Sequence, residues 1–296
     1  MNQTRAATDR AKACFLRACA LDVAVRKPGN VSAASAGHGM DAAMFIASAQ
    51  AAARPLFEPG ARVGERIEAA VDASWAVAGC NTNLGIVLLC APIALAVERQ
   101  PDAAAPAALR HAVEAVLAEL DLADAQAAYR AIARVRPGGL GAAPREDVNQ
   151  PPGVDLRAGM ALAADRDRIA CQYRDGYADL FELGLAALGP GFALTTTEAT
   201  GAVDARTVAA VQRLYLALLG SAADSHIVRI HGEAVAHTVM AAAQRWQARV
   251  QRPGGLDADP GFAAWDAALK AERINPGTTA DLTVATLLVA GLTAPA

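Results

Sequence analysis

Apolar residues recur at intervals of three and four along the chain, which is the spacing that one face of an α-helix produces. Ala13, Leu16, Ala20 and Val23 show this spacing near the start of the sequence. No run alternates convincingly between apolar and polar residues, and the aromatic and β-branched residues that favour strands are sparse. The pattern therefore predicts an all-α protein.

Pro and Gly divide the sequence into predicted helices, because Pro fixes φ and lacks a donor while Gly reaches positive φ. The ranges 83–98 and 278–292 are apolar on nearly every face, so we expect these two helices at the centre. We predict a single domain over residues 1–296, a multi-helix bundle of about 10–12 helices, with 147–153 as the softest boundary. The predicted helices cover residues 6–25, 40–53, 62–78, 83–98, 104–118, 122–134, 155–188, 204–219, 222–249, 260–272 and 278–292.

Composition narrows the class of protein further. Hydrophobic residues make up 54% of the chain and charged residues 19%, which excludes disorder and collagen-like repeats. The net charge is −3 and no basic tract stands out, so nucleic acid and anionic membranes are not expected partners. The longest apolar run, 84–97, is shorter than the roughly 20 residues that span a bilayer. Five cysteines without a CxxC pair, after a polar start, indicate reduced thiols and a cytoplasmic protein.

The first loop of chemical interest follows the predicted helix 6–25. Lys27 stands beside a Pro-Gly turn in a chain that has few lysines, and its ammonium group could hold a phosphate. Asn30 belongs to the same loop, and His38 and Asp41 follow at a helix start. The alternative is purely structural, a helix stop followed by Asp41 as the N-cap of helix 40–53.

The second loop places Asn81, Thr82 and Asn83 directly before the first central helix. A helix N-terminus offers free N–H groups and the positive end of the dipole, which suit an anion. Capping by Thr82 or Asn83 would also explain a polar residue here. A cap needs one polar side chain and this loop has three, so the excess favours a binding site.

The third loop, Asn275 to Asp281, precedes the other central helix in a similar arrangement. It carries Thr278 and Thr279, and Asp281 would enter the core about one turn into the helix unless it is paired. A carboxylate there could take a Mg²⁺ ion that bridges phosphates. The alternative is an acidic residue that the helix dipole stabilises.

A fourth segment, 224–232, puts His226 and Arg229 on one helical face, where Arg229 could hold a phosphate. His226 and His231 lack the HExxH spacing, so zinc is disfavoured. The charged segment 165–175 is more typical of a solvated helix face. No P-loop, no dinucleotide-binding GxGxxG and no GxSxG motif occurs, so any nucleotide would be bound in another way.

The order of these loops resembles the triphosphoribosyl-dephospho-CoA synthase family. The matching runs are KPGNVS, GHGMD, GCNTNLGIVLLCAPIALA and INPGTTADLTVATLL, and the resemblance spans roughly residues 10–292. It implies an all-helical enzyme that takes ATP and dephospho-CoA, releases adenine, and makes the precursor of a decarboxylase prosthetic group. Within the motifs, the family's Lys-Pro-Gly matches Lys27 to Gly29, its His element matches His38 with Asp41, its Asn-Thr element matches Asn81 to Gly85, and its Pro-Gly element matches Asn275 to Leu282.

The middle of the chain departs from this pattern. The family's Thr-Gly-x-Arg-Gly-Glu-Ala run is missing, and its Asp-Thr-Asn element is replaced by Asp224-Ser-His226 with Arg229 following. This version of the motifs resembles a divergent branch of the family, which occurs in archaea and in methylotrophic or related bacteria. An enzyme of one-carbon cofactor synthesis, for methanopterin or methanofuran, is therefore an alternative with the same use of ATP and a different acceptor.

The resemblance implies substitution at C1′ of the ATP ribose through an oxocarbenium-like transition state. On that basis Lys27 and Arg229 would bind phosphate, and Asp281 would be a catalytic carboxylate and, with Asp224, a Mg²⁺ ligand. His38 or Asp41 would be the base. Phosphate or ribose would contact Asn30, Asn81, Thr82, Asn83, Asn275, Thr278 and Thr279.

Two readings outside catalysis stay open at this point. A non-catalytic helical protein could hold a nucleotide or a CoA-like ligand without turnover, and a helical scaffold with well-capped loops would bind no ligand at all. Close packing of Ala-rich helices leaves a homodimer open, but no residue marks its interface.

Overall fold

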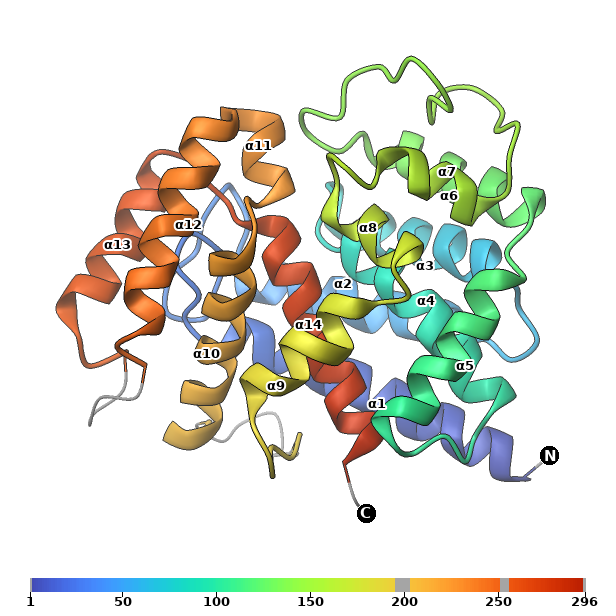
Figure 1. Cartoon of the computed structure of the whole chain (residues 1–296), viewed down its shortest axis with the longest axis horizontal. Helices are drawn as coiled ribbons and strands as arrows, with labels where there is room; N and C mark the ends of the chain where they lie inside the picture. The colour runs from blue at the N-terminus through green and yellow to red at the C-terminus, as the bar shows by residue number, and fades with distance from the viewer. Residues whose placement is uncertain (1, 195–202, 251–255, 295–296) are drawn as a thin grey trace.

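The computed structural model describes residues 2–194, 203–250 and 256–294, where all regular structure is helical apart from two isolated bridges within 32–40 (Figure 1). The all-α prediction is confirmed. The helices are α1 (Asn2–Ala24), α2 (Ala42–Leu56), α3 (Val63–Ala78), α4 (Leu84–Arg99), α5 (Pro106–Ala118), α6 (Leu122–Val135), α7 (Leu156–Ala163), α8 (Arg168–Arg174), the π-helical η1 (Asp179–Gly184), α9 (Leu185–Leu188), α10 (Ala205–Ser221), α11 (Ser225–His231), α12 (Glu233–Gln247), α13 (Pro260–Ala271) and α14 (Gly277–Thr293).

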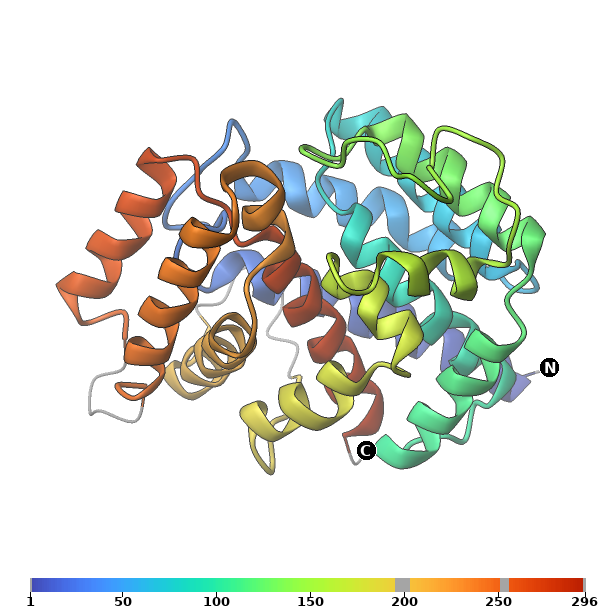
Figure 2. The ribbon, with the colours of Figure 1, turned by 45° about the horizontal axis from the view of Figure 1, so that its top comes forward.

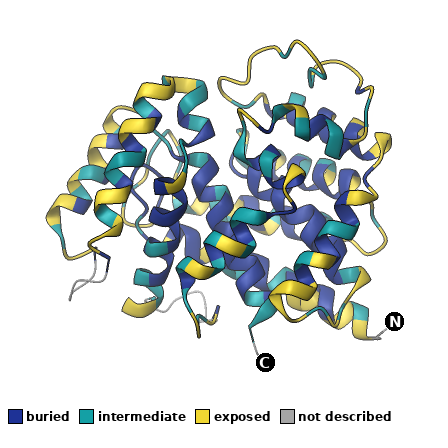
Figure 3. Ribbon diagram, in the orientation of Figure 1, coloured by how far each residue is buried: buried dark blue, intermediate teal, exposed yellow. Residues whose placement is uncertain are grey.

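Helices α4 and α14 form the centre of the molecule, as predicted. Every residue of α4 from Leu84 to Val97 is buried, and so is nearly all of α14 between Thr278 and Leu292. Figure 3 shows both helices in the buried colour, surrounded by helices whose outer faces are exposed. A helix that is apolar on all sides is stable only when other elements cover every face, so these two set the positions of the rest.

Two clusters of buried side chains lie on the two sides of α14. The larger cluster packs α1 to α6 around α4 and α14, and the smaller one joins α10 to α11, α12 and α13. Helix α10 contributes to both, with Leu214 and Leu218 in the larger cluster and Tyr215 and Leu219 in the smaller one. Figure 2 shows α14 running between these two groups of helices.

Two of the ranges predicted as single helices are divided into shorter helices in the structure. The number of helices is therefore higher than the predicted range. The range 155–188 breaks before α8, where Asp167 accepts from the N–H groups of Ile169 and Ala170, and again at Gly176 and Tyr177, which both have a φ of 60°. The range 222–249 breaks at Gly232, whose φ is 87°. Positive φ values end a helix because they turn the chain out of the right-handed helical region.

Within the described residues, no helix is both long enough and apolar enough to cross a membrane.

Candidate functional site

Loops that are distant in the sequence meet at the N-terminal ends of α4 and α14. Asn30 donates from Nδ2 to Oδ1 of Asn275 over 2.9 Å. Gly29 has a φ of 82°, and a Cβ built there would lie 2.8 Å from Cδ of Pro276, so only glycine fits this contact. The two Pro-Gly turns that the sequence singled out are therefore packed against each other.

A cavity of about 410 Å³ lies between these helix ends and the segments around α6, α7, α8 and α11. Its volume is within the range of roughly 300–1,000 Å³ that is typical of small-molecule sites. The structure brings most of the predicted site residues to its wall: Asn30, Asn81, Thr82, Asn83, Arg229, Asn275, Thr278 and Asp281. Five predicted residues lie outside the lining: Lys27, His38, Asp41, Asp224 and Thr279.

Lys27 does not reach the cavity. Its side chain is fully buried, and Nζ donates to the carbonyl oxygens of Asp22 (2.6 Å) and Val31 (3.4 Å) and lies 3.3 Å from Oδ2 of Asp22. The predicted phosphate contact is therefore corrected to a contact within the protein. The sequence does not show this contact, because it depends on the chain turning back after α1, which brings Lys27 against Asp22 of that helix.

His38 and Asp41, the two candidate bases, also have other contacts. Asp41 accepts from the N–H of Met44 over 2.9 Å and caps α2, which is the structural alternative considered for it. His38 donates from Nε2 to the carbonyl of Gly29 over 2.7 Å. The structure thus gives neither residue a place beside a ligand in this cavity.

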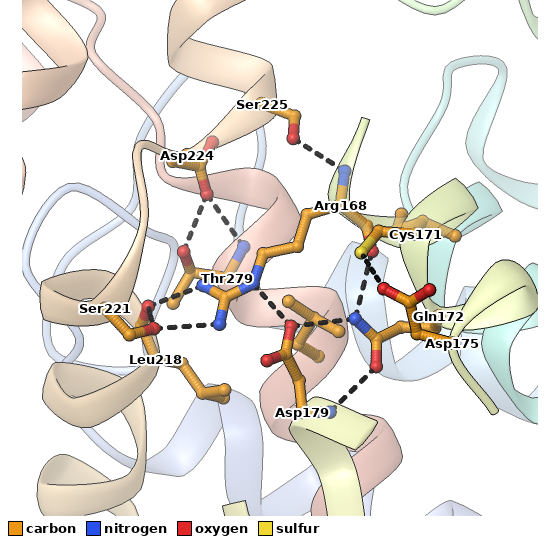
Figure 4. Close-up of polar contacts among 12 residues, drawn as sticks. Arg168, Cys171, Gln172, Asp175, Asp179, Leu218, Ser221, Asp224, Ser225 and Thr279 are labelled. Carbon is orange, nitrogen blue, oxygen red and sulfur yellow. Dashed lines mark hydrogen bonds and ion pairs between the residues drawn. The ribbon is translucent and has the colours of Figure 1, made fainter. Parts of the chain in front are cut away.

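Asp224 holds α11 and α14 together (Figure 4). Its Oδ1 accepts from the N–H groups of His226 (2.9 Å) and Ile227 (3.1 Å). Its Oδ2 accepts from N (2.8 Å) and Oγ1 (2.7 Å) of Thr279. Four hydrogen bonds engage both oxygens of a side chain that is almost fully buried, so a metal ion would have to break them. The metal role predicted for Asp224 is corrected to this structural one, and Thr279 shares it.

The three polar residues before α4 have separate roles. Asn81 caps the helix, because its Oδ1 accepts from the N–H of Leu84 over 3.2 Å. Thr82 donates to Oγ of Ser48 over 2.8 Å and so fixes the loop to α2. Asn83 lines the cavity, is 5% exposed, and its Nδ2 has no partner among the described residues. The excess of polar residues thus resolves into a side chain that caps α4, an anchor to α2 and a residue of the cavity wall.

Asp281 lies on the cavity wall where α14 passes α4. A Cβ built at Gly85 would overlap Oδ2 of Asp281, so the absence of a side chain at Gly85 lets the carboxylate sit against α4. Burial raises the pKa of Asp281 well above its ordinary value, and the charges of Asp224 and Asp22 raise it further. The Arg229 guanidinium opposes this rise.

Arg229 reaches the cavity from α11. Its Nη1 forms an ion pair with Oδ2 of Asp167 over 2.6 Å, while its buried Nε has no partner in the described part of the chain. Nδ2 of Asn83 and Oδ1 of Asp22 are likewise buried and without a hydrogen-bond partner among the described residues. Buried polar atoms normally have hydrogen-bond partners, so three unpartnered ones in residues that line the cavity favour a polar ligand.

Arg168 joins α8 to the helices around it (Figure 4). Arg168 pairs with Oδ2 of Asp179 over 2.7 Å, donates to the carbonyl of Leu218 over 2.6 Å and to Oγ of Ser221 over 2.8 Å. Oγ of Ser225 accepts from the backbone N–H of Arg168 over 2.9 Å. These contacts join α8 to η1, α10 and α11, so the charged segment 165–175 is partly structural.

Three parts of the cavity wall were not among the predicted site residues. Asp22 stands in the apolar run Leu21-Asp22-Val23, and a lone carboxylate in such a run was the available signal. Burial raises its pKa, against the effect of Lys27. His226 lines the cavity, and its pKa is lowered, mainly by burial.

The third missed part is the segment between α6 and α7, where residues 137, 139–141, 143 and 145–148 line the cavity. It has no periodic pattern that would have marked it as part of a site. Burial raises the pKa of Tyr129, which lies on the same side of the cavity, to about 12. That side combines the apolar side chains of Met160 and Leu162 with the charged ones of Arg145 and Arg166.

Together these features define an all-helical protein with a small-molecule site, in which polar side chains gather at the ends of α4 and α14 and both apolar and charged side chains line the wall toward α7. The chain matches the ATP:dephospho-CoA triphosphoribosyl transferase family over residues 8–296 and belongs to that family. The chain is therefore a transferase. The family match confirms both the resemblance and the enzyme class that the sequence predicted.

The fold has a counterpart among solved structures. A crystal structure from Archaeoglobus fulgidus, described as a triphosphoribosyl-dephospho-CoA synthase, matches with a TM-score of 0.62 and 22% identity. The match covers 84% of this chain and 98% of that one. At this identity the likeness supports the fold. The search of curated proteins returned no match.

Proposed function

We propose that this chain transfers the triphosphoribosyl group of ATP to a hydroxyl of dephospho-CoA and releases adenine in the cavity at the ends of α4 and α14. The observation that carries the proposal is the set of unpartnered buried atoms of Asp22, Asn83 and Arg229, three residues that line the cavity together with Asp281. Family membership supplies the reaction class. The ends of α4 and α14 would receive the nucleotide, and the wall toward α7, with its apolar and charged side chains, would receive the acceptor.

The reaction breaks the bond between C1′ of the ribose and N9 of adenine and forms a bond from C1′ to the acceptor oxygen. The electron pair of the broken bond leaves with adenine, which gains one proton, and the acceptor hydroxyl loses one. Positive charge develops on the ribose during this exchange, so a carboxylate nearby lowers the barrier. His226 replaces His38 and Asp41 as the candidate base, because it lines the cavity and its lowered pKa keeps it neutral near pH 7.

The triphosphate would lie at the ends of the two central helices. First-turn N–H groups and the positive ends of the helix dipoles favour anions there. Arg229 has an unpartnered Nε and would add its charge by turning from Asp167 toward phosphate oxygens. Asn83 would donate its free amide.

A Mg²⁺ ion remains part of the proposal, with a changed set of ligands. No group of three His, Cys, Asp or Glu side chains close enough to hold a metal occurs among the described residues. Mg²⁺ bound to phosphates keeps several waters and takes only one or two carboxylates, so Asp281 fits as its protein ligand and Asp224 does not. When bound, the ion would neutralise charge on the triphosphate.

Dephospho-CoA is the acceptor that family membership favours, and aliphatic side chains on the wall toward α7 agree with it. Leu140 and Leu162 line the cavity and are each 38% exposed, and Ile230 nearby is 45% exposed. Exposed large aliphatic side chains at a cavity mouth would contact the pantetheine arm, which is longer and less polar than a pterin. We also propose the cytoplasm, where ATP is abundant, as the compartment.

The test is an incubation of purified protein with ATP, Mg²⁺ and dephospho-CoA, with free adenine and the adduct measured by liquid chromatography and mass spectrometry. The proposal predicts adenine and a triphosphoribosyl adduct in equal amounts. Parallel reactions replace dephospho-CoA with pterin or furan precursors. Adenine release with one of those acceptors alone would contradict the proposed acceptor, and no adenine with any acceptor would contradict the transferase proposal.

A further inference from the structure

The pair of Asp22 and Lys27 is the part of the cavity wall that the proposed function leaves unexplained. Asp22 lies near the end of α1, is 4% exposed and lines the cavity. Its Oδ2 faces Nζ of Lys27 at 3.3 Å, and its buried Oδ1 has no partner in the described ranges. A purely structural ion pair would be expected to use both oxygens, because a buried oxygen without a partner is costly.

Lys27 has no donor free for a ligand from the cavity. It is 0% exposed, and Nζ is surrounded by Oδ2 and the carbonyl of Asp22 and the carbonyl of Val31. The turn that carries it is held from outside, since Tyr215 donates to the carbonyl of Pro28 over 2.8 Å. The ammonium group is therefore fixed against Asp22, and Lys27 does not line the cavity.

The other carboxylates on the wall do not share this situation. The lining acids are Asp22, Glu146, Asp147, Asp167 and Asp281. Asp147 and Glu146 accept from backbone N–H groups of their own loop. Asp167 caps α8 and pairs with an arginine of α11. Asp281 is the carboxylate proposed for Mg²⁺, which leaves Asp22 as the one with a fixed counter-ion and a free oxygen.

We infer that Asp22 is the carboxylate that stabilises the positive charge on the ribose during transfer, and that Lys27 is a positioning residue that acts through Asp22. The inference rests on the proposed function. The carboxylate of Asp22 faces C1′ while the bond to N9 of adenine breaks and the bond to the acceptor oxygen forms. Asp22 is unchanged at the end, because the proton lost by the acceptor hydroxyl balances the one that adenine gains. A preorganised charge in a site that excludes water stabilises a transition state far more than it would in solvent.

The experiment compares adenine release by the wild type, Asp22→Asn, Lys27→Met and the double variant, with kcat and the KM for ATP measured separately. Asp22→Asn keeps the shape of the side chain and should lower kcat by about 100-fold or more, with the KM for ATP nearly unchanged. Lys27→Met should lower kcat with the same unchanged KM. The double variant should be no slower than Asp22→Asn, because Lys27 acts through Asp22.

The matched control is Asp266→Asn, which disrupts another buried lysine–aspartate pair, on α13, that contacts the same turn. Asp266 pairs with Lys270 over 2.9 Å and accepts from the N–H of Gly29, but neither partner lines the cavity. This variant should lower the melting temperature and leave kcat near the wild-type value. An equal loss of kcat in Asp266→Asn would show that the turn matters and the charge of Asp22 does not, which would overturn the inference.

Other outcomes separate the inference from the function on which it rests. A wild type that releases adenine while Asp22→Asn keeps its kcat overturns the inference alone. A rise in the KM for ATP with unchanged kcat in Lys27→Met also overturns it, because that is the effect of losing a phosphate contact. A wild type that releases no adenine overturns the proposed function, and the inference with it. If Lys27→Met does not fold, Asp22→Asn and its control still decide the question.

Discussion

Replacing Gly85 with alanine adds a single methyl group, and this group would displace the carboxylate of Asp281. A Cβ at Gly85 would overlap Oδ2 of Asp281 and lie 2.6 Å from its Cγ and from Cδ1 of Ile169. Side chains do not approach this closely, so the carboxylate must move or α4 must shift. A displacement of about 1 Å at a reacting group can lower a rate by about 100-fold, and we expect a loss of that size in kcat.

The expected effect on stability is much smaller. Overpacking costs about 1–3 kcal/mol, and alanine in a helix is better than glycine by about 0.5–1 kcal/mol, which leaves a net loss of about 0–2.5 kcal/mol. The assays are adenine release and urea unfolding of the same preparations. Gly184→Ala is the control, because its Cβ would lie 2.6 Å from Cγ2 of Thr286 and Gly184 does not line the cavity.

The control should lose a similar amount of stability and keep kcat within about twofold of the wild type. A Gly85→Ala variant with the wild-type kcat would refute the reasoning, because it would show that the position of the Asp281 carboxylate does not matter to the reaction. Equal losses of kcat in both variants would refute it too, since overpacking far from the cavity would then be sufficient.

Three further predictions concern neighbouring residues. Arg229→Ala should raise the KM for ATP by about 10- to 150-fold, the cost of a charge-assisted hydrogen bond, and an unchanged KM would exclude a phosphate contact. The acid limb of kcat/KM should fall below pH 6.5, because burial lowers the pKa of His226 and the neutral ring is the base; a midpoint above 6.5 would be inconsistent with this. Asp224→Asn should lower the free energy of unfolding by about 1–3 kcal/mol in a urea titration, because it weakens the cap of α11 and the bonds to Thr279. A stable variant that has lost its response to Mg²⁺ would instead restore the metal role of Asp224.

The sequence predicted the architecture well where one local signal was enough. Helices α4 and α14 are apolar on all faces, and that pattern alone placed them at the centre. The break at Gly232 was visible as a glycine, but a glycine within a helical pattern does not reveal its φ. The break at Tyr177 had no signal of its own beyond the preceding Gly176, because its positive φ depends on tertiary packing.

The sequence predicted the site residues that stand at the N-terminus of a central helix. It did not predict the roles of polar residues whose hydrogen-bond or ion-pair partners lie elsewhere in the chain. Asn83 and Asp281 precede or begin the central helices, and both line the cavity. Lys27 was assigned to phosphate because the sequence cannot show that its ammonium group is fully buried against Asp22. Asp224 looked like a metal ligand because its bonds to Thr279 join segments 55 positions apart.

The measurement that tests the account most directly is adenine release by Asp281→Asn beside the wild type, with ATP, Mg²⁺ and dephospho-CoA and with melting temperatures recorded for both. Asparagine keeps the size of the side chain and removes its capacity to carry a negative charge at the cavity wall. The account predicts equal amounts of adenine and adduct from the wild type, and almost none of either from a variant that is still folded. A folded variant that releases adenine at the wild-type rate would contradict the placement of the reaction in the cavity between α4 and α14.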